Sequence, residues 1–295
     1  MQDLRGKVAF ITGGASGIGF SMAEAFGAEG MAVMLADIEA EALERAVEDL
    51  RSRQIRAEGV VADVASRASI KAAAEATIAA FGKVHVVCNN AGVGAGGPFG
   101  SFPPGDWDWV IDVNLKGVVY GMEVFEPLIA AHGEGGHFVN TASLAGMVSP
   151  PGMEPYCATK FAVVAMSEGW AQQLAPRNIG VSVLCPGFVK TRINESRRNP
   201  PSDYGPDERA PPPPDAPPSR VLSGIPVEPV GRRVVEAVKA NELYVFTHPE
   251  AKPAVEARFK RILAAFDTAE ASPALAGLPK RSPGPLGGRA LPQIF

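Results

Sequence analysis

Two side chains that together could exchange a proton with an alcohol or ketone lie one helical turn apart. Tyr156 and Lys160 share the stretch Tyr156-Cys157-Ala158-Thr159-Lys160, which begins a helical pattern over residues 156–174. Residues at i and i+4 lie on the same face of a helix, so the Lys160 ammonium can approach the Tyr156 phenol. A fixed cation favours the phenolate and lowers a phenol pKa from about 10 toward the working pH of an acid/base group. We therefore predict that Tyr156 gives and takes the proton of such an oxygen.

A glycine-rich turn near the start of the chain is suited to a phosphate. An apolar strand pattern over residues 8–12 runs into Thr12-Gly13-Gly14-Ala15-Ser16-Gly17-Ile18-Gly19 and then into a helical pattern. Glycines let the backbone turn sharply, and a helix N-terminus offers free N–H donors and the positive end of its dipole. The spacing is G-x-x-x-G-x-G, which differs from the general dinucleotide fingerprint G-x-G-x-x-G. A plain strand-to-helix turn is the alternative interpretation.

An acid ends the second strand pattern. Asp37 lies in Leu35-Ala36-Asp37-Ile38, 18 residues after Gly19. A carboxylate there can accept hydrogen bonds from the ribose of a dinucleotide and would repel a 2′-phosphate. Neither position 16 nor position 38 holds the Lys or Arg that would bind such a phosphate. This pattern predicts NAD rather than NADP. Asp37 could also be a helix N-cap, a role compatible with the first.

Short apolar runs alternate with helical patterns along the first 190 residues. Such alternation predicts an α/β fold, a single doubly wound parallel sheet flanked by helices, with right-handed crossovers. The expected strands are 8–12, 32–37, 59–64, 84–89, 137–141, 181–185 and, after an interruption, 243–247. The expected helices are 21–29, 39–53, 66–81, 107–131, 156–174, 231–240 and 254–269.

Further motifs stand at the ends of these expected elements, in a fixed order. They are Asp63-Val64, Asn89-Asn90-Ala91-Gly92, Asn114 on the long helix, Ser143 after the fifth strand, and Pro186-Gly187-Phe188-Val189-Lys190-Thr191 after the sixth. Together with the glycine turn and the Tyr/Lys pair, they resemble the short-chain dehydrogenase/reductase family in its common short form. The resemblance covers roughly residues 4–191 and resumes near 231–247.

The resemblance implies a Rossmann-type fold and an oxidoreductase that interconverts a secondary alcohol and a ketone with NAD. It assigns Ser143 to the substrate oxygen, Lys160 to the nicotinamide ribose and Asn114 to a water relay for the proton. The positive charge of the oxidised nicotinamide would add to that of Lys160 in favouring the Tyr156 phenolate. The implied cofactor contacts are Gly13, Ser16, Gly17, Ile18, Gly19, Asp37, Ile38, Asp63, Val64, Asn90, Ala91, Gly92, Tyr156, Lys160, Pro186, Gly187, Val189 and Thr191.

Each candidate catalytic residue also has an ordinary structural interpretation. Tyr156 could lie at an amphipathic rim, Lys160 on a solvated helix face, Ser143 in a turn, and Asn114 in a local pairing within its helix. Two other functions also remain open, a non-catalytic NAD-sensing regulator and a non-redox epimerase or dehydratase. All four catalytic residue types are present, and 295 residues leave little room for a large substrate domain. The redox enzyme is therefore the favoured interpretation.

Composition excludes several other classes. The formal net charge is −4. The chain therefore lacks the excess of basic residues expected of a nucleic-acid binder or of a helix that lies on a membrane surface. No apolar run approaches the ~18–20 residues of a membrane span, and the N-terminus lacks a secretory pattern. Three scattered cysteines predict neither disulfides nor zinc, and the histidines lack metal-ligand spacing. We expect a cytoplasmic protein without a metal, and the resemblance implies a homodimer or homotetramer paired through 107–131 and 156–174.

An excess of proline marks the region that follows the last motif. Of 27 prolines in the chain, eleven lie between 200 and 229, and residues 211–214 are consecutive prolines. We expect a core of 1–191 and 229–250, a Pro-rich insertion at 192–228, and a C-terminal helix with a flexible tail at 251–295. The insertion could be a lid stiffened by proline over the substrate, or a disordered segment.

Loops around the expected reaction centre suggest the kind of substrate. Residues 93–102 and 144–151 are mostly small and apolar, which favours an uncharged, bulky molecule. Arg192, Arg197 and Arg198 could bind an anionic group on it, or could form a solvated basic loop. The stretches 195–198, 204–205 and 243–250 also resemble a bacterial subgroup that includes dehydrogenases of lignin-derived aryl ethers. That resemblance implies an aromatic alcohol or ketone as substrate.

Overall fold

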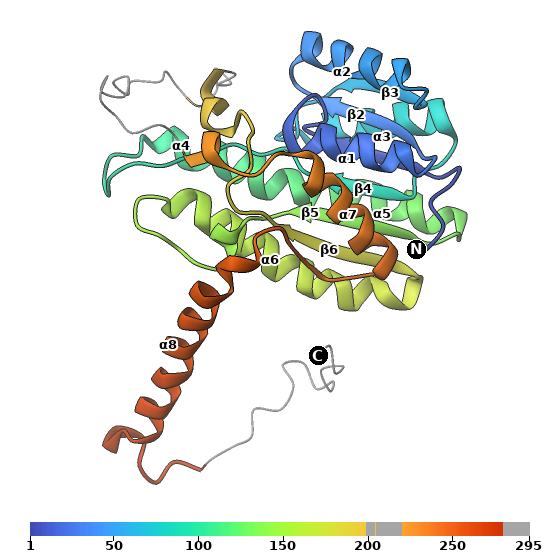
Figure 1. The fold of residues 1–295 in the computed structure, drawn as a ribbon. Helices are drawn as coiled ribbons and strands as arrows, with labels where there is room; N and C mark the ends of the chain where they lie inside the picture. Colours follow the sequence, from blue (N-terminus) through green and yellow to red (C-terminus); the bar gives the residue numbers. More distant parts are fainter. Residues whose placement is uncertain (199–203, 205–219, 280–295) are drawn as a thin grey trace. The chain divides into compact units, whose positions relative to one another are not determined.

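Seven parallel strands form one sheet in the order β3-β2-β1-β4-β5-β6-β7, which confirms the predicted doubly wound α/β fold. The computed structural model describes residues 1–198, 204 and 220–279 (Figure 1). Every strand pair is parallel. The strands are β1 (Val8–Thr12), β2 (Ala32–Asp37), β3 (Ala57–Val61), β4 (Val86–Asn89), β5 (Gly136–Thr141), β6 (Ile179–Cys185) and β7 (Tyr244–Phe246).

Helices cover both faces of this sheet, as the apolar central strands require. All five residues of β1, all four of β4 and all six of β5 are buried, so neither face of these strands meets water. One face carries α1 (Gly17–Ala28), α2 (Ala40–Ser52) and α7 (Glu228–Ala240). The other carries α3 (Arg67–Phe81), α4 (Pro104–Ile111), α5 (Gly117–His132) and α6 (Glu154–Leu174).

Besides shifts of a few residues at the ends of other elements, two differences from the sequence prediction bear on the site. The third strand spans 57–61 instead of 59–64, because the chain turns at Asp63, whose carboxylate accepts the N–H of Ala65 at 2.9 Å. Asp63 and Val64 therefore lie beyond the strand. The predicted long helix 107–131 is interrupted by a π-helical turn, Asp112–Lys116, between α4 and α5. Such turns are frequent at functional sites, and this one contains Asn114.

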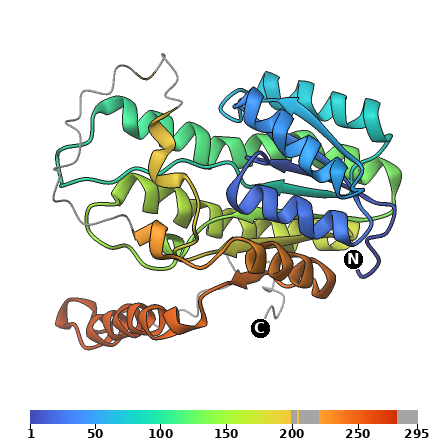
Figure 2. The same ribbon diagram turned by 45° about the horizontal axis from the view of Figure 1, so that its top comes forward.

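Helices from opposite ends of the fold lie side by side. Figures 1 and 2 both show α1 next to α7, although about 200 residues separate them. The Ser21 hydroxyl donates to the carbonyl of Val227 at 2.7 Å. A Cβ on Gly231 would lie 2.2 Å from the Ser21 carbonyl oxygen, so only glycine permits this approach. The chain that returns from the Pro-rich insertion is thereby held beside the glycine-rich turn.

The two ends of the Pro-rich insertion lie side by side. Val189 and Ile225 form an isolated parallel bridge, with Lys190 N–H donating to Ile225 and Ile225 N–H donating to Phe188, both at 2.9 Å. A Cβ on Gly224 would lie 2.3 Å from the Phe188 carbonyl oxygen, which explains a glycine at this crossing. The predicted polyproline run at 211–214 lies outside the described residues, as does most of the predicted lid.

The chain divides into two compact units, residues 1–248 and 249–295, and the predicted domain assignment stays a prediction. The second unit contains α8 (Lys252–Glu270) and a short 3₁₀ turn at Pro273–Leu275. The predicted flexible tail lies mainly beyond residue 279, outside the described residues. Among the described residues, every helix is too short or too polar to cross a membrane.

Candidate active site

Hydrogen bonds join the carboxyl ends of three neighbouring strands. The Thr12 hydroxyl, at the end of β1, accepts the N–H groups of Asn90 and Ala91 at 2.9 and 3.0 Å. The Asn90 side chain donates to the Thr12 carbonyl at 3.0 Å and accepts from the Thr141 hydroxyl at 3.2 Å. These contacts fix the ends of β1, β4 and β5 against one another. In doubly wound sheets this is the edge at which ligands bind.

Three of the predicted catalytic side chains meet at this edge. Ser143, two residues beyond β5, lies close enough to the hydroxyl of Tyr156 on α6 to lower the pKa of that phenol. The Lys160 Nζ lies 5.5 Å from the centre of the Tyr156 ring and donates to the Thr141 carbonyl at 2.9 Å. Tyr156 and Lys160 are both buried. A Cβ on Gly146 would lie 2.6 Å from the Lys160 carbonyl oxygen, so this glycine lets the segment after Ser143 lie directly against α6.

The charge states of this group differ from the sequence prediction. Burial raises the pKa of Tyr156 to about 12, although the hydrogen bond to Ser143 opposes the shift. Burial likewise lowers the pKa of Lys160 to about 8. The predicted lowering of the phenol pKa by Lys160 is therefore wrong for the protein alone. The physical reason is that desolvation of the phenolate outweighs the attraction of an ammonium that is directed at Thr141.

Asn114 reaches the site from the π-helical turn, and it is fully buried. Its side-chain Oδ1 accepts the N–H of Val93 at 2.8 Å, while its Nδ2 donates to the carbonyl of the same residue at 2.9 Å. A Cβ on Gly92 would lie 3.2 Å from Asn114 Oδ1 and 3.6 Å from Lys160 Nζ. Asn114 thus fixes the loop that follows Gly92 and lies next to the Tyr156 and Lys160 group.

The glycine-rich turn fits the pyrophosphate of a dinucleotide. Gly13 and Gly17 have φ of +63° and +58°, and a Cβ on Gly19 would lie 2.1 Å from the Gly13 carbonyl oxygen. Ser16 caps α1 without a side-chain hydrogen bond, and the first turn of the helix holds no acid. The N–H groups and the positive end of the dipole are therefore available to an anion.

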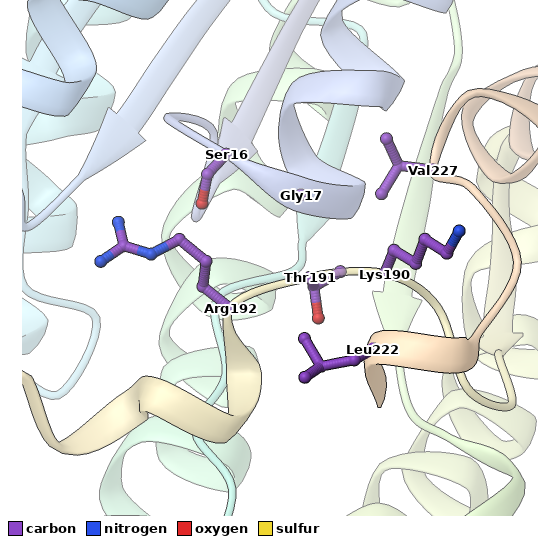
Figure 3. Close-up of a pocket in the computed structure, with 7 residues that line it drawn as sticks. All are labelled: Ser16, Gly17, Lys190, Thr191, Arg192, Leu222 and Val227. Carbon is purple, nitrogen blue, oxygen red and sulfur yellow. The ribbon is translucent and has the colours of Figure 1, made fainter. Parts of the chain in front are cut away.

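A pocket of about 350 Å³ opens at this turn. Figure 3 shows Ser16 and Gly17 on one side of it, facing Thr191 and Arg192 from the segment after β6. Val227, from the end of the Pro-rich insertion, completes the wall next to α1. Of the predicted cofactor contacts, Thr191 after β6 and Ser16 and Gly17 after β1 therefore line one pocket.

Asp37 contacts the same turn from the end of β2. Its Oδ2 accepts the N–H of Ala15 at 3.0 Å, and its Oδ1 accepts the N–H of Glu39 at 3.1 Å. The N-cap of α2 is Glu39, so the alternative of Asp37 as a helix N-cap is wrong. The carboxylate instead ties the glycine turn to β2. Ile38, beside it, is 46% exposed.

All the predicted cofactor contacts follow the carboxyl end of a strand or lie on α6. They are Gly13, Ser16, Gly17, Ile18 and Gly19 after β1; Asp37 and Ile38 at β2; Asp63 and Val64 after β3; Asn90, Ala91 and Gly92 after β4; Pro186, Gly187, Val189 and Thr191 after β6; and Tyr156 and Lys160 on α6. Val64 is buried, and a Cβ on Gly117 would lie 3.1 Å from it. Their binding roles stay predictions.

Sequence reasoning missed His248, which supports the turn at Gly187. The Nδ1 of His248 accepts the N–H of Gly187 at 3.1 Å, and its Nε2 lies 3.2 Å from the Phe188 carbonyl. A Cβ on Gly187 would lie 2.8 Å from the imidazole, so the ring packs flat against this glycine. The available signal was the position of His248 at the end of the last strand, which pairs with β6.

The segment Ile193–Arg198 is held on three sides. Ser196 accepts the N–H of Gly94 at 3.0 Å, Arg197 pairs with the buried Asp106 of α4, and the Arg198 Nε donates to Glu39 at 2.9 Å. Arg192 also pairs with Glu195. These acids neutralise Arg192, Arg197 and Arg198, the three arginines that the sequence suggested as ligands of an anionic substrate group. Glu39 is a second residue that sequence reasoning missed.

A cluster of His85, His132 and Glu134 lies away from this edge, where the sequence predicted no metal site. Its ring nitrogens are already engaged. The Nδ1 atoms of His85 and His132 accept the N–H groups of Val8 and Glu134, each at 3.2 Å. Their Nε2 atoms contact Glu134 Oε2 at 3.0 Å and the Val84 carbonyl at 2.9 Å. A metal would have to displace these bonds, so the cluster is accounted for by hydrogen bonding.

Comparison with known proteins settles the family. The family model for short chain dehydrogenases matches residues 7–202. The chain is a short-chain dehydrogenase/reductase. It is 36% identical over 276 residues to the C alpha-dehydrogenase of Sphingobium sp. strain SYK-6, a match that covers 92% of this chain and 90% of the relative.

Two further relatives extend over nearly the whole chain. A CLA biosynthesis dehydrogenase/reductase of Lactiplantibacillus plantarum is 34% identical, over 89% of this chain and 95% of the relative. The crystal structure of a Burkholderia phymatum short-chain dehydrogenase/reductase, solved in complex with NAD, is 38% identical with a TM-score of 0.83. That match covers 90% of this chain and 97% of the other. This short-chain dehydrogenase/reductase is therefore an oxidoreductase of a family that typically uses NAD(P). Its location and assembly stay predictions.

Proposed function

We propose that this short-chain dehydrogenase/reductase interconverts a secondary alcohol and a ketone, with NAD as the preferred cofactor. The observation that carries the proposal is the meeting of Ser143, Tyr156 and Lys160 at the same edge of the sheet as a glycine turn that fits a pyrophosphate. When bound, the nicotinamide accepts or supplies the hydride, which is the cofactor's own chemistry.

The protein contributes binding, orientation and the movement of one proton. Ser143 donates a hydrogen bond to the substrate oxygen, and Tyr156 gives that oxygen a proton in reduction or takes it in oxidation. Since the protein alone raises the pKa of Tyr156 to about 12, the phenol is held protonated and ready to donate. Oxidation needs a further positive charge at the site, which the oxidised cofactor carries. Asn114 keeps the loop after Gly92 in place through Val93.

Preference for NAD is supported by the Asp37 carboxylate at the end of β2. The Ala15 N–H holds this carboxylate toward the glycine turn. A 2′-phosphate would bring a like charge against Asp37, which costs several kcal/mol when it is not screened. The Burkholderia relative crystallised with NAD supports the same choice.

The substrate class follows from the loops that flank Ser143 and Gly92. Ala95, Ala145 and Met147 are buried apolar residues there. The arginines of 193–198 are paired with acids of the protein, which supports an uncharged substrate over an anionic one. We infer a bulky apolar or aromatic alcohol or ketone, in line with the similarity to a C alpha-dehydrogenase.

Replacing Tyr156 by Phe tests the mechanism. Tyr156→Phe removes only the hydroxyl, so NAD binding is retained while turnover of a secondary alcohol falls by about 10²-fold or more. NADH absorbance reports turnover, and calorimetric titration reports NAD binding. The matched control is Tyr244→Phe, which removes a hydroxyl that donates to Glu168 at 2.7 Å. Near-normal turnover of Tyr156→Phe would contradict the proposed role.

A further inference from the structure

Within the unit of residues 249–295, helix α8 carries an apolar face that no other described residue of this unit covers. At 100° per residue, Val255, Phe259, Ile262, Leu263 and Phe266 fall within an arc of about 100° on one side of the helix. None of the residues of α8 is buried, and Phe259, Leu263 and Phe266 are 50%, 63% and 69% exposed. In proteins most of the stability of a helix comes from packing of its apolar face rather than from helix propensity. This face therefore requires a partner.

The charges of α8 run against its own dipole. Residues 252–261 contain four cations and one acid, whereas residues 262–270 contain two acids and no cation. A helix dipole favours the opposite order, with acids near the N-terminus and cations near the C-terminus. The arrangement thus disfavours the isolated helix. A second α8 in the opposite direction reverses this effect, because its acidic half meets the cationic half and the two dipoles oppose each other.

We propose that α8 pairs antiparallel with α8 of a second copy of this chain, about a two-fold axis near residues 262 and 263. The apolar face is centred on these residues, close to the middle of the helix. Pairing there places Phe259 against the partner's Phe266, and Ile262 against the partner's Leu263. Lys260 and Asp267 lie on the same flank of the helix, so Lys260 comes beside the partner's Asp267. A two-fold axis makes each contact twice.

A second copy fits this face better than a lipid surface does. A helix that binds anionic lipid carries cations along the whole polar flank. Here the C-terminal half is acidic, with Asp267 and Glu270 close to the apolar face. The pairing uses a surface other than the α5 and α6 faces through which the family resemblance implies assembly. It does not depend on the proposed reaction.

A pair of matched substitutions tests the surface in the full-length chain. Leu263→Asp places a charge in the centre of the apolar face, and Ala264→Asp places the same residue one position on, on the opposite side of the helix. Leu263→Asp is expected to raise the dissociation constant of self-association by at least about tenfold, while Ala264→Asp leaves it unchanged. Sedimentation equilibrium over a dilution series measures this constant, and urea unfolding checks that both variants are folded.

A charge exchange tests the direction of the pairing. Lys260→Asp and Asp267→Lys each bring like charges together in an antiparallel pair, so each weakens association by several-fold. The double variant restores opposite charges and association close to wild type. Equal association of Leu263→Asp and Ala264→Asp would overturn the proposal. So would a loss of unfolding stability or of binding to anionic vesicles in Leu263→Asp with unchanged association, because the face would then pack on its own chain or on lipid.

Discussion

At the scale of single residues, the fold by itself keeps the Tyr156 phenol protonated. Burial raises the pKa of this phenol, and Lys160 is directed at Thr141 instead of the phenol oxygen. The interaction with Ser143 favours the phenolate, but burial outweighs it. The resting site is therefore prepared to donate a proton. In the proposed reaction, oxidation would then depend on the positive charge of the oxidised cofactor.

Asp37 provides a prediction at the same scale. Asp37→Asn removes the charge and keeps an oxygen that can accept the N–H of Ala15. We expect the ratio of kcat/KM for NAD over NADP to fall by at least about tenfold, since the repulsion of a 2′-phosphate is lost. Turnover with both cofactors measures the ratio. An unchanged ratio would limit Asp37 to holding the glycine turn.

At the scale of elements, the segment 193–198 directly follows two residues that line the pocket, Thr191 and Arg192. Thr191 faces Gly17 across that pocket, and Arg198 reaches Glu39 at the end of β2. Ser196 and Arg197 hold the same segment to the loop after β4 and to α4. The segment thus links the elements on both sides of the proposed cofactor site, and its contacts should influence cofactor affinity.

Arg198→Gln tests this link. The substitution removes the ion pair with Glu39 and so loosens the attachment of segment 193–198 to the end of β2. The Kd for NAD is therefore expected to rise by about fivefold, with little change in the free energy of unfolding. Calorimetric titration and urea unfolding measure the two quantities. Arg53→Gln is the control, because it removes a partly exposed ion pair with Asp49 and Glu24 outside the site. A similar effect of both variants on NAD binding would contradict the link.

At the scale of the whole molecule, a buried histidine makes the free energy of unfolding depend on pH. His137 of β5 is fully buried, its Nε2 lies 2.8 Å from the Ser182 hydroxyl, and that hydroxyl donates to the Glu242 carbonyl. Its Nδ1 has no hydrogen-bond partner among the described residues. Burial lowers the pKa of His137 to about 3. The imidazole must therefore stay neutral for the sheet to form.

The sign of the pH dependence follows from this shift. The unfolded chain binds a proton at His137 below about pH 6.5, whereas the folded chain does not until about pH 3. The free energy of unfolding is therefore highest above about pH 6.5 and falls as the pH is lowered. His137 contributes up to ~1.4 kcal/mol per pH unit to this fall. Urea unfolding between about pH 7 and pH 5 measures the slope. His137→Gln, which keeps a donor toward Ser182, should reduce it, and an unchanged slope would show that other groups cause it.

Short-range patterns were sufficient for the sheet and for the positions of the motifs. Apolar runs and glycine spacing are properties of neighbouring residues, so β1, β2 and the order of strands and helices could be predicted closely. The end of β3 and the interruption of the long helix could not. They depend on the side chain of Asp63 turning the backbone and on the π turn that aims Asn114 at Val93.

The sequence by itself determined the family, the fold and the set of residues that could do chemistry, because these follow from residue type and local spacing. The tertiary structure decided what surrounds each of them. Arg198 meets Glu39 across 159 positions of the chain, and His248 meets Gly187 across 61. The pKa of Tyr156 rises because the folded chain excludes water from the phenol, although the spacing to Lys160 alone predicted a fall. Burial and long-range contacts exist only in the folded chain. They determine the pKa of Tyr156 and Lys160 and the ion-pair partners of the arginines.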